Sequence, residues 1–233
     1  MVAAGLFSAA GQGISMTAAE ILTVLTQWTP YLAVGFVWNI IISVSSMAIG
    51  TGIGAALAVL RVARGKAPAG AARLATDFAR SVPTFVMLYY LAYLVPAGIE
   101  VAGVQVAFPG WLKASVALSI SVVGFVSDNG AVALRDWRAG NAAAALLFLP
   151  NWTAMLLIIV MASSTASLLG VGEIVSRCNT MIAAVGRADL MLWAYVYTML
   201  WFLGFCWPLS LLVERLRRHL AVRLSGVNEI TAR

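Results

Sequence analysis

Long stretches without a single Asp, Glu, Lys or Arg limit the folds that this chain can adopt. The longest are Ile21–Leu60 and Ala139–Gly172. A helix needs roughly 20 mainly apolar residues to cross about 30 Å of hydrocarbon, so each stretch is long enough to span a membrane. With 62% hydrophobic and 10% charged residues, the composition lies far from that of soluble domains. A β-barrel would show short segments of alternating hydrophobicity, whereas these runs are continuous. The sequence therefore predicts an all-α polytopic membrane protein.

About five transmembrane helices are predicted. Four windows are uncharged: Tyr31–Leu60, Ser81–Ile99, a segment within Ala139–Gly172, and Leu190–Val213. The third span, Trp111 to about Leu134, carries Lys113 near one end and Asp128 near the other, and only Ala114–Ser127 between them is uncharged. The stretch Ala139–Gly172, which holds the fourth span, is too long for one straight span at about 1.5 Å per residue. We expect a break in it near Pro150 or after Ser167.

The positions of the basic residues predict the topology, because cytoplasmic loops carry an excess of Lys and Arg. Of the 15 basic residues, only Lys113, Arg177 and Arg187 fall on the side opposite to the others. The others follow the first span, follow the third span, or lie in the tail: Arg61, Arg64, Lys66, Arg73, Arg80, Arg135, Arg138, Arg215, Arg217, Arg218, Arg223 and Arg233. The N-terminus is thus expected outside and the C-terminus in the cytoplasm.

This topology divides the chain into three parts. We expect an external or interfacial segment 1–27, a transmembrane domain 28–213 and a basic cytoplasmic tail 214–233. The formal net charge of +6 follows from the topology, so we expect no nucleic-acid partner, which would need a basic reading face on a soluble surface.

Catalytic groups are scarce in this sequence. The one histidine, His219, lies in the basic tail, and the two cysteines show no metal-binding spacing. No Gly-rich phosphate loop followed by Lys and Ser or Thr is present. We therefore expect no enzymatic activity, no metal and no cofactor; any ATP hydrolysis belongs to another subunit.

Ionisable residues near membrane depth are costly and mark candidates for function. Asp77 and Arg80 are three residues apart and share a helix face, where they are expected to pair at the cytoplasmic boundary, with Pro83 in the first turn of the second span. Asp128, at the inner end of the third span, is expected to cap its helix or to pair with Arg135.

Two motifs carry a family resemblance. The segment T-D-F-A-R-S-V-P (Thr76–Pro83) shows an acid-x-x-Arg-x-x-Pro signature before a span that closes with Val95-Pro96. The segment M-A-S-S-T-A-S-L-L-G-V-G-E-I (Met161–Ile174) runs from small hydroxyl residues into Gly-x-x-Glu. Residues Trp28–Arg218 resemble the membrane (permease) subunits of ABC importers for polar amino acids, of the histidine/glutamine type.

The resemblance implies a type I ABC importer permease fold in the bacterial inner membrane, forming half of a translocation pathway. The implied partners are a second permease-like subunit in a homo- or heterodimer, an ATP-binding subunit, a periplasmic substrate-binding protein and membrane lipid. It makes Asp77, Arg80 and Pro83 the cytoplasmic elbow into the second core helix. It also places four residues along the substrate path or gate: Ser163, Ser164, Ser167 and Glu173.

Glu173 has two interpretations. As a gate residue, its carboxylate would contact the ammonium of an amino acid. Alternatively, it forms an i, i+4 ion pair with Arg177 that stabilises an external helix. The family also carries Lys-Asp where this chain has Met161-Ala162, so a charged pair is missing from the substrate path or gate.

The loop between the third and fourth spans departs most from the family, whose members place a Glu-Ala-Ala coupling helix there to dock into the ATPase. The degenerate loop of this chain comprises Asp136, Gly140, Asn141, Ala143, Ala144 and Ala145. An ungapped alignment instead puts Ala131-Val132-Ala133 on the motif and Leu149-Pro150 on the later Leu-Pro, and neither alignment gives an intact loop. We expect weak or absent contact with an ATP-binding subunit.

Two functions follow from these observations. The chain is either a working permease half, or a permease-derived structural or accessory subunit of a larger membrane complex that has lost ATPase coupling.

Overall fold

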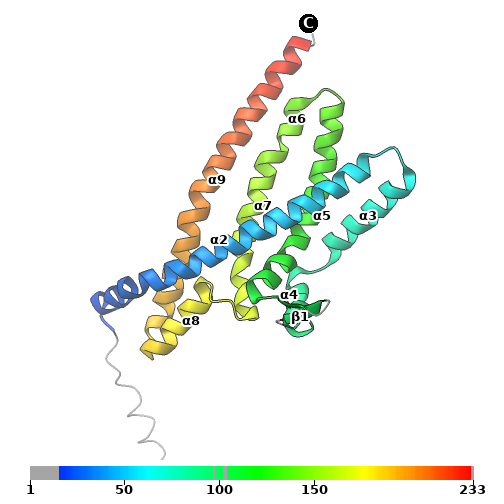
Figure 1. The fold of residues 1–233 in the computed structure, drawn as a ribbon. Coiled ribbons are helices and arrows are strands. Elements are labelled where there is room, and N and C mark those ends of the chain that lie inside the picture. Colours follow the sequence, from blue (N-terminus) through cyan, green and yellow to red (C-terminus); the bar gives the residue numbers. More distant parts are fainter. Residues whose placement is uncertain (1–15, 97, 102–103, 232–233) are drawn as a thin grey trace, which may run out of the picture.

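The computed structural model describes residues 16–96, 98–101 and 104–231, and Figure 1 shows its helical architecture. In chain order the elements are α2 (Ala18–Val62), α3 (Lys66–Ser81), α4 (Thr84–Tyr93), β1 (Gly98–Val101), β2 (Val104–Ala107), α5 (Gly110–Arg138), α6 (Ala142–Leu146), α7 (Phe148–Ala162), the 3-10 helix η2 (Ser163–Leu169), α8 (Ile174–Val185) and α9 (Leu190–Thr231). The predicted helical class is confirmed, with one small antiparallel hairpin of β1 and β2 added.

Four segments are long and apolar enough to cross a membrane. They are Ala18–Val62, Gly110–Arg138, Ala144–Leu169 and Leu190–Arg218. These segments contain most or all of the first, third, fourth and fifth predicted spans. The fourth changes from α-helix to 3-10 helix at Ser163 and ends at Gly170, whose φ of 72° lies in the left-handed region that glycine tolerates. The break expected after Ser167 is therefore present.

The predicted second span, Ser81–Ile99, is not one helix. Helix α3 ends at Ser81, α4 covers only Thr84–Tyr93, and the chain enters β1 at Gly98. Pro83 is the cause, because it lacks an N–H and disfavours helical backbone at the residue before it; Val82 accordingly has a ψ of 119°. Pro83 is the residue before α4 and not part of its first turn.

Helices α3 and α4, which meet at Pro83, run antiparallel to α5. Three contacts mark its path: Thr76 with Ser127, Thr84 with Ser121, and the Lys113 ammonium with the carbonyl of Val95. Residue numbers increase from Thr76 to Val95 while the residue numbers of their partners on α5 decrease from Ser127 to Lys113. The helical packing on α5 therefore begins at α3, inside the segment that the charge pattern had assigned to a loop.

The core is built around close packing of α2 on α5. A Cβ added at Gly50 would lie 2.4 Å from Cβ of Val122, and one at Gly54 would lie 2.8 Å from Cβ of Val126. Only glycine permits this approach. These two glycines therefore serve helix packing within the chain, because α5 of the same chain covers them.

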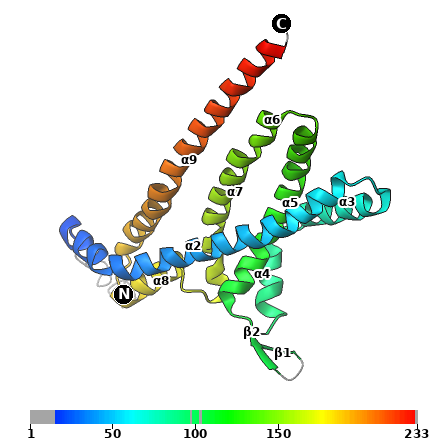
Figure 2. The same ribbon diagram turned by 45° about the horizontal axis from the view of Figure 1, so that its top comes forward.

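The turns of the chain alternate between two ends. In Figure 1 the α5–α6 turn and the end of α9 lie toward the top, whereas β1 and α8 lie toward the bottom; the same order is visible in Figure 2. At the first end, which we call the basic end, Arg138 donates to the carbonyl of Val62 at 3.1 Å and Arg217 donates to Asn151 Oδ1 at 3.0 Å. This alternation matches the predicted topology, and the side of the membrane that each end faces stays a prediction.

The predicted domain boundaries do not coincide with helix ends. Helix α2 begins at Ala18, inside the segment 1–27, and α9 continues past residue 214 to Thr231. Residues 1–15 of the N-terminal segment lie outside the described residues. The division into three parts therefore stays a prediction.

Candidate functional site

A buried set of polar side chains joins three elements and includes two of the predicted gate residues. We call it the Asn39 cluster: Asn39 of α2, Ser163 of η2 and Glu173 before α8. Asn39 Nδ2 donates to Ser163 Oγ at 2.9 Å and to Glu173 Oε2 at 3.1 Å, and Asn39 Oδ1 accepts from the N–H of Ile174 at 3.1 Å. All three side chains are 0% exposed. The cluster therefore fixes the start of α8 against α2.

Glu173 also caps α8. Its carboxylate accepts the backbone N–H groups of Val175 at 3.0 Å and Ser176 at 2.7 Å, and a carboxylate at this position stabilises the positive end of a helix. Burial raises the pKa of the Glu173 carboxyl, while these N–H groups and Asn39 lower it. Contact between Glu173 and a substrate ammonium stays a prediction, since the carboxylate is enclosed here.

The alternative interpretation of Glu173 is wrong. Arg177 does not pair with it but donates to the carbonyls of Gly172 at 2.8 Å and Tyr31 at 3.2 Å, and its guanidinium lies 4.5 Å from the centre of the Tyr31 ring. The capping role explains this, because the Glu173 side chain folds back over the first turn of α8 while Arg177 points toward α2.

The hydroxyl groups of the three predicted pathway serines each donate a hydrogen bond to the backbone carbonyl three residues earlier. The hydroxyl of Ser163 bonds the carbonyl of Val160 at 2.7 Å, that of Ser164 bonds Met161 at 2.9 Å, and that of Ser167 bonds Ser164 at 3.0 Å. Such bonds satisfy donors where water is scarce. Only Ser163 joins the Asn39 cluster, whereas Ser164 and Ser167 remain half-buried on η2.

A second polar group, the Asp128 cluster, joins α2, α3 and α5. It comprises Arg61, Thr76, Arg80, Ser127 and Asp128. Arg61 Nη1 donates to Asp128 Oδ1 at 2.5 Å and Arg80 Nη1 to Asp128 Oδ2 at 2.6 Å, while the hydroxyls of Thr76 and Ser127 are 2.7 Å apart. One carboxylate thus binds two guanidinium groups from two different helices.

The predicted pairs of Asp77 with Arg80 and of Asp128 with Arg135 are therefore wrong. Arg80 packs over Gly124, since a Cβ added there would meet Arg80 Cγ at 2.7 Å. This contact directs the side chain along α5 to Asp128, one turn further on. Sequence spacing reports which residues share a helix face but not which groups a neighbouring helix offers.

The Asp128 cluster is partly open to its surroundings. The Arg80 side chain is 61% exposed and Asp128 27%, whereas Arg61 is only 15% exposed. Beside them lies a cavity of about 300 Å³, also lined by Ser121 and Asn129. Because ionisable groups are costly against lipid, this side of α3 and α5, which we call the polar face, is expected to meet water or protein.

The predicted degenerate coupling loop is a tight turn. Helix α5, which includes Asp136, continues to Arg138, and Gly140 adopts a φ of 83°. Asn141 then caps α6 by accepting the N–H of Ala144 at 3.2 Å. Helix α6, which contains the alanine run Ala143 to Ala145, has only 5 residues and leads into the fourth span. Whether this turn contacts an ATPase stays a prediction.

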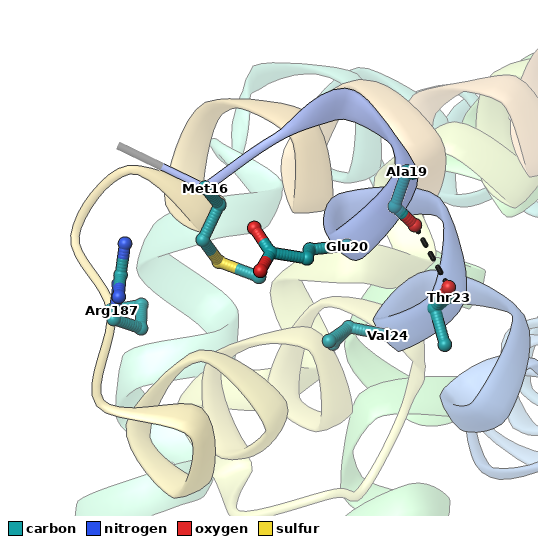
Figure 3. A pocket seen from close by; sticks show the side chains of 6 residues that line it. All are labelled: Met16, Ala19, Glu20, Thr23, Val24 and Arg187. Atoms are coloured by element: carbon teal, nitrogen blue, oxygen red, sulfur yellow. Dashed lines mark hydrogen bonds between the residues drawn. The ribbon is translucent and has the colours of Figure 1, made fainter. Parts of the chain in front are cut away.

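Figure 3 shows a third polar region, at the end opposite to the basic end. A cavity of about 590 Å³ lies between Glu20 near the start of α2 and Arg187 before α9. Arg187 binds Asp189 at 2.8 Å, and the N–H of Met16 also donates to Asp189 at 2.6 Å. These two donors hold the pKa of Asp189 well below its usual range. Within the described ranges, no three His, Cys, Asp or Glu residues are placed to hold a metal ion.

Comparison with known proteins supports the fold. No protein-family model and no curated protein matches the sequence. The chain superposes on one chain of a solved structure described as "Crystal structure of an amino acid ABC transporter with histidines", with a TM-score of 0.66 and 17% sequence identity. The match covers 86% of this chain and 100% of that chain. The ABC permease fold expected from the sequence is thus confirmed.

Asn39 is the site residue that sequence reasoning missed. It lies in the middle of an uncharged apolar window, where an amide side chain must find partners within the protein. That isolation was the available signal. It could have identified Asn39 as a polar contact, but not Glu173 and Ser163 as its partners.

Proposed function

We propose that this chain is a transmembrane permease subunit of an ABC-type importer for polar amino acids and forms half of the translocation pathway. The observation that carries the proposal is the polar face at Arg80 and Asp128, in a chain whose fold covers the whole of an amino acid transporter chain. A charged, partly exposed surface on spanning helices needs an aqueous path or a protein partner.

The pathway of this proposal runs along the polar face. Ser121 and Thr84, whose hydroxyls are 2.5 Å apart, continue this face from Asp128 toward the opposite end. A second permease-like chain supplies the other wall. In this proposal the predicted gate acts at the end away from the Asp128 cluster. Its residues are Ser163, Ser164, Ser167 and Glu173. The buried Asn39 cluster corresponds to the closed state of this gate.

The proposed assembly follows from the same fold. The chain pairs with itself or with a sister permease in the bacterial inner membrane, with its N-terminus outside and its C-terminus in the cytoplasm. A periplasmic binding protein delivers the amino acid, and an ATP-binding subunit supplies energy without an active site in this chain. Asp77, Arg80 and Pro83 form the cytoplasmic elbow of the broken second span.

One observation favours the alternative, a permease-derived structural subunit without ATPase coupling. Between α5 and α6 only Ala139, Gly140 and Asn141 lie outside helix, and α6 leads directly into the fourth span. A docking helix that transmits closure as a rigid body must project from the bundle. In the permease proposal, the nucleotide-driven motion therefore arrives mainly through the partner permease.

The test is ATP-driven uptake by the complex purified with its own partners and reconstituted in liposomes. We expect an ATP-binding subunit to co-purify and labelled polar amino acids to accumulate. Asp128→Asn should lower the uptake rate at least about tenfold, because it removes charge from the path, whereas the matched variant Asp77→Asn should retain it. Co-purification with an unrelated membrane complex, without an ATP-binding subunit, would establish the structural alternative.

A further inference from the structure

An apolar groove lies at the basic end, lined by other residues of α2 and α5 than those of the Asp128 cluster. It has a volume of about 330 Å³ and is bounded by α2, α5, α6 and the start of α7. Its width comes from small residues, among them Ala55, Gly130 and Ala133, while Trp137 and Phe148 add aromatic walls. Trp137 is 62% exposed, so the groove opens to the surroundings of the chain.

The groove is as long as one leaflet of a membrane. On α5 its lining extends from Val126 to Trp137, which at 1.5 Å per residue is about 16 Å. Half of the roughly 30 Å hydrocarbon thickness is about 15 Å. The Trp137 end lies beside the α5–α6 turn, and tryptophan is enriched where hydrocarbon meets headgroups.

A cation follows the groove lining at its Trp137 end. Val126, Gly130 and Leu134 of the lining repeat every four residues along α5, and Arg138 is the next residue of that series. Arg138 is exposed and donates one N–H to the carbonyl of Val62, just beyond groove residue Val59 on α2. A guanidinium carries five N–H donors, so donors remain for a phosphate.

We propose that this groove binds an anionic phospholipid of the leaflet at the basic end, with one acyl chain in the groove and the headgroup phosphate on Arg138. A lipid has one charged end and an apolar tail of one leaflet, which is the pattern found here. A partner helix would cross both leaflets and would not require a cation at one end. Basic pockets between transmembrane helices are established sites for anionic headgroups. This proposal does not rest on the transport function.

The test is native mass spectrometry of the purified complex titrated with phosphatidylglycerol or phosphatidylcholine carrying identical acyl chains. We expect at least about tenfold tighter binding of phosphatidylglycerol. Arg138→Gln should remove most of that preference, because a charge-assisted bond to phosphate is lost. The matched control Arg135→Gln removes an exposed arginine from the same turn but outside the groove series, and should keep the preference.

Filling the groove gives a second, independent test. Ala133→Leu on α5 and Ala55→Leu on α2 should each weaken binding of both lipids at least about fivefold, and the exposed position of Ala55 makes that variant safe for folding. Equal binding of the two lipids by the unaltered chain would overturn the proposal. So would equal losses in the two arginine variants, or disulfide crosslinking of a cysteine placed at residue 133 to another protein chain.

Discussion

The Asn39 cluster and the Asp128 cluster both join helices through polar side chains, but they do so in opposite ways. The Asn39 cluster is fully buried, and both ends of its central amide are hydrogen-bonded within the chain. The Asp128 cluster contains two cations for one anion, and one of those cations, Arg80, is mostly exposed. The first is closed within the chain, whereas the second presents charge to whatever lies beside it.

The difference teaches where each kind of polar group can be used in a membrane. An uncharged amide can be buried completely if every donor and acceptor has a partner. A charged pair with an excess cation needs a polar surrounding as well. The Asn39 cluster is therefore suited to fixing the start of α8, and the Asp128 cluster to contact with water, a substrate or a partner chain.

The largest expected effect comes from opening the Asn39 cluster. Asn39→Leu removes partners from Glu173, Ser163 and the N–H of Ile174, and each unsatisfied buried group costs about 1–3 kcal/mol. We expect a stability loss of about 3 kcal/mol, which for a chain of this size lowers Tm by roughly 6–12 °C. Thermal unfolding of the purified protein in detergent measures this shift.

The control is Asn129→Leu, which removes an amide that donates to the carbonyl of Phe125 in its own helix at 3.0 Å. We expect a shift of at most about 2 °C for this variant, since half-buried Asn129 loses only one hydrogen bond within its own helix, at a net cost of about 0.5 kcal/mol. Equal Tm shifts in the two variants would show that the Asn39 cluster stabilises the fold no more than a single hydrogen bond within one helix.

A smaller effect should separate the two arginines of the Asp128 cluster. Arg61→Gln removes a 15% exposed partner of Asp128 and Arg80→Gln a 61% exposed one. Buried pairs lose more when broken than surface pairs, which contribute about 0–1 kcal/mol, so we expect about 2 kcal/mol for Arg61 and under about 1 kcal/mol for Arg80. Thermal unfolding at two salt concentrations tests this.

Salt sharpens the comparison. Added salt screens exposed charges more than buried ones, so the loss caused by Arg80→Gln should shrink at high salt while that caused by Arg61→Gln persists. The same salt response in both variants would contradict the difference in burial on which the polar face is based.

Sequence reasoning succeeded where the deciding property is local. Apolar length alone predicted the spans that became α2 and α9, because crossing hydrocarbon depends on a continuous window. The span that became α5 was predicted although it carries Lys113 and Asp128 near its ends. The second predicted span was harder to place. Its sequence pattern predicts that Pro83 starts the helix, whereas Pro83 lies between two separate helices, α3 and α4. Contacts with α5 also show that residues whose charges had suggested a loop form the packed helix α3.

The pairing of charges could not be predicted, because it depends on which helix lies opposite. Arg80 reaches Asp128 only because Gly124 leaves room for its side chain, and Arg61 reaches the same carboxylate from α2. Neither of these two arginines is close in sequence to Asp128. In the same way Glu173 and Arg177 satisfy the spacing for an ion pair, yet the helix cap and Tyr31 provide better partners.

The smallest expected effect lies in the half-buried pair of Asp189 and Arg187, of which Arg187 lines the cavity of Figure 3. Asp189→Asn should lower Tm only slightly near neutral pH, because both side chains are partly solvated.

The folded pKa of Asp189 lies below its usual value, so its ionised form stabilises the fold above the unfolded pKa of about 3.9. That contribution is lost as pH falls toward the lower, folded pKa. The Tm gap between wild type and variant should therefore be constant from about pH 6 to 8 and narrow below about pH 4. A double-mutant cycle with Arg187→Gln should assign most of the gap at neutral pH to the pair. A gap that widens on acidification would reverse the sign and show that the carboxylate opposes folding.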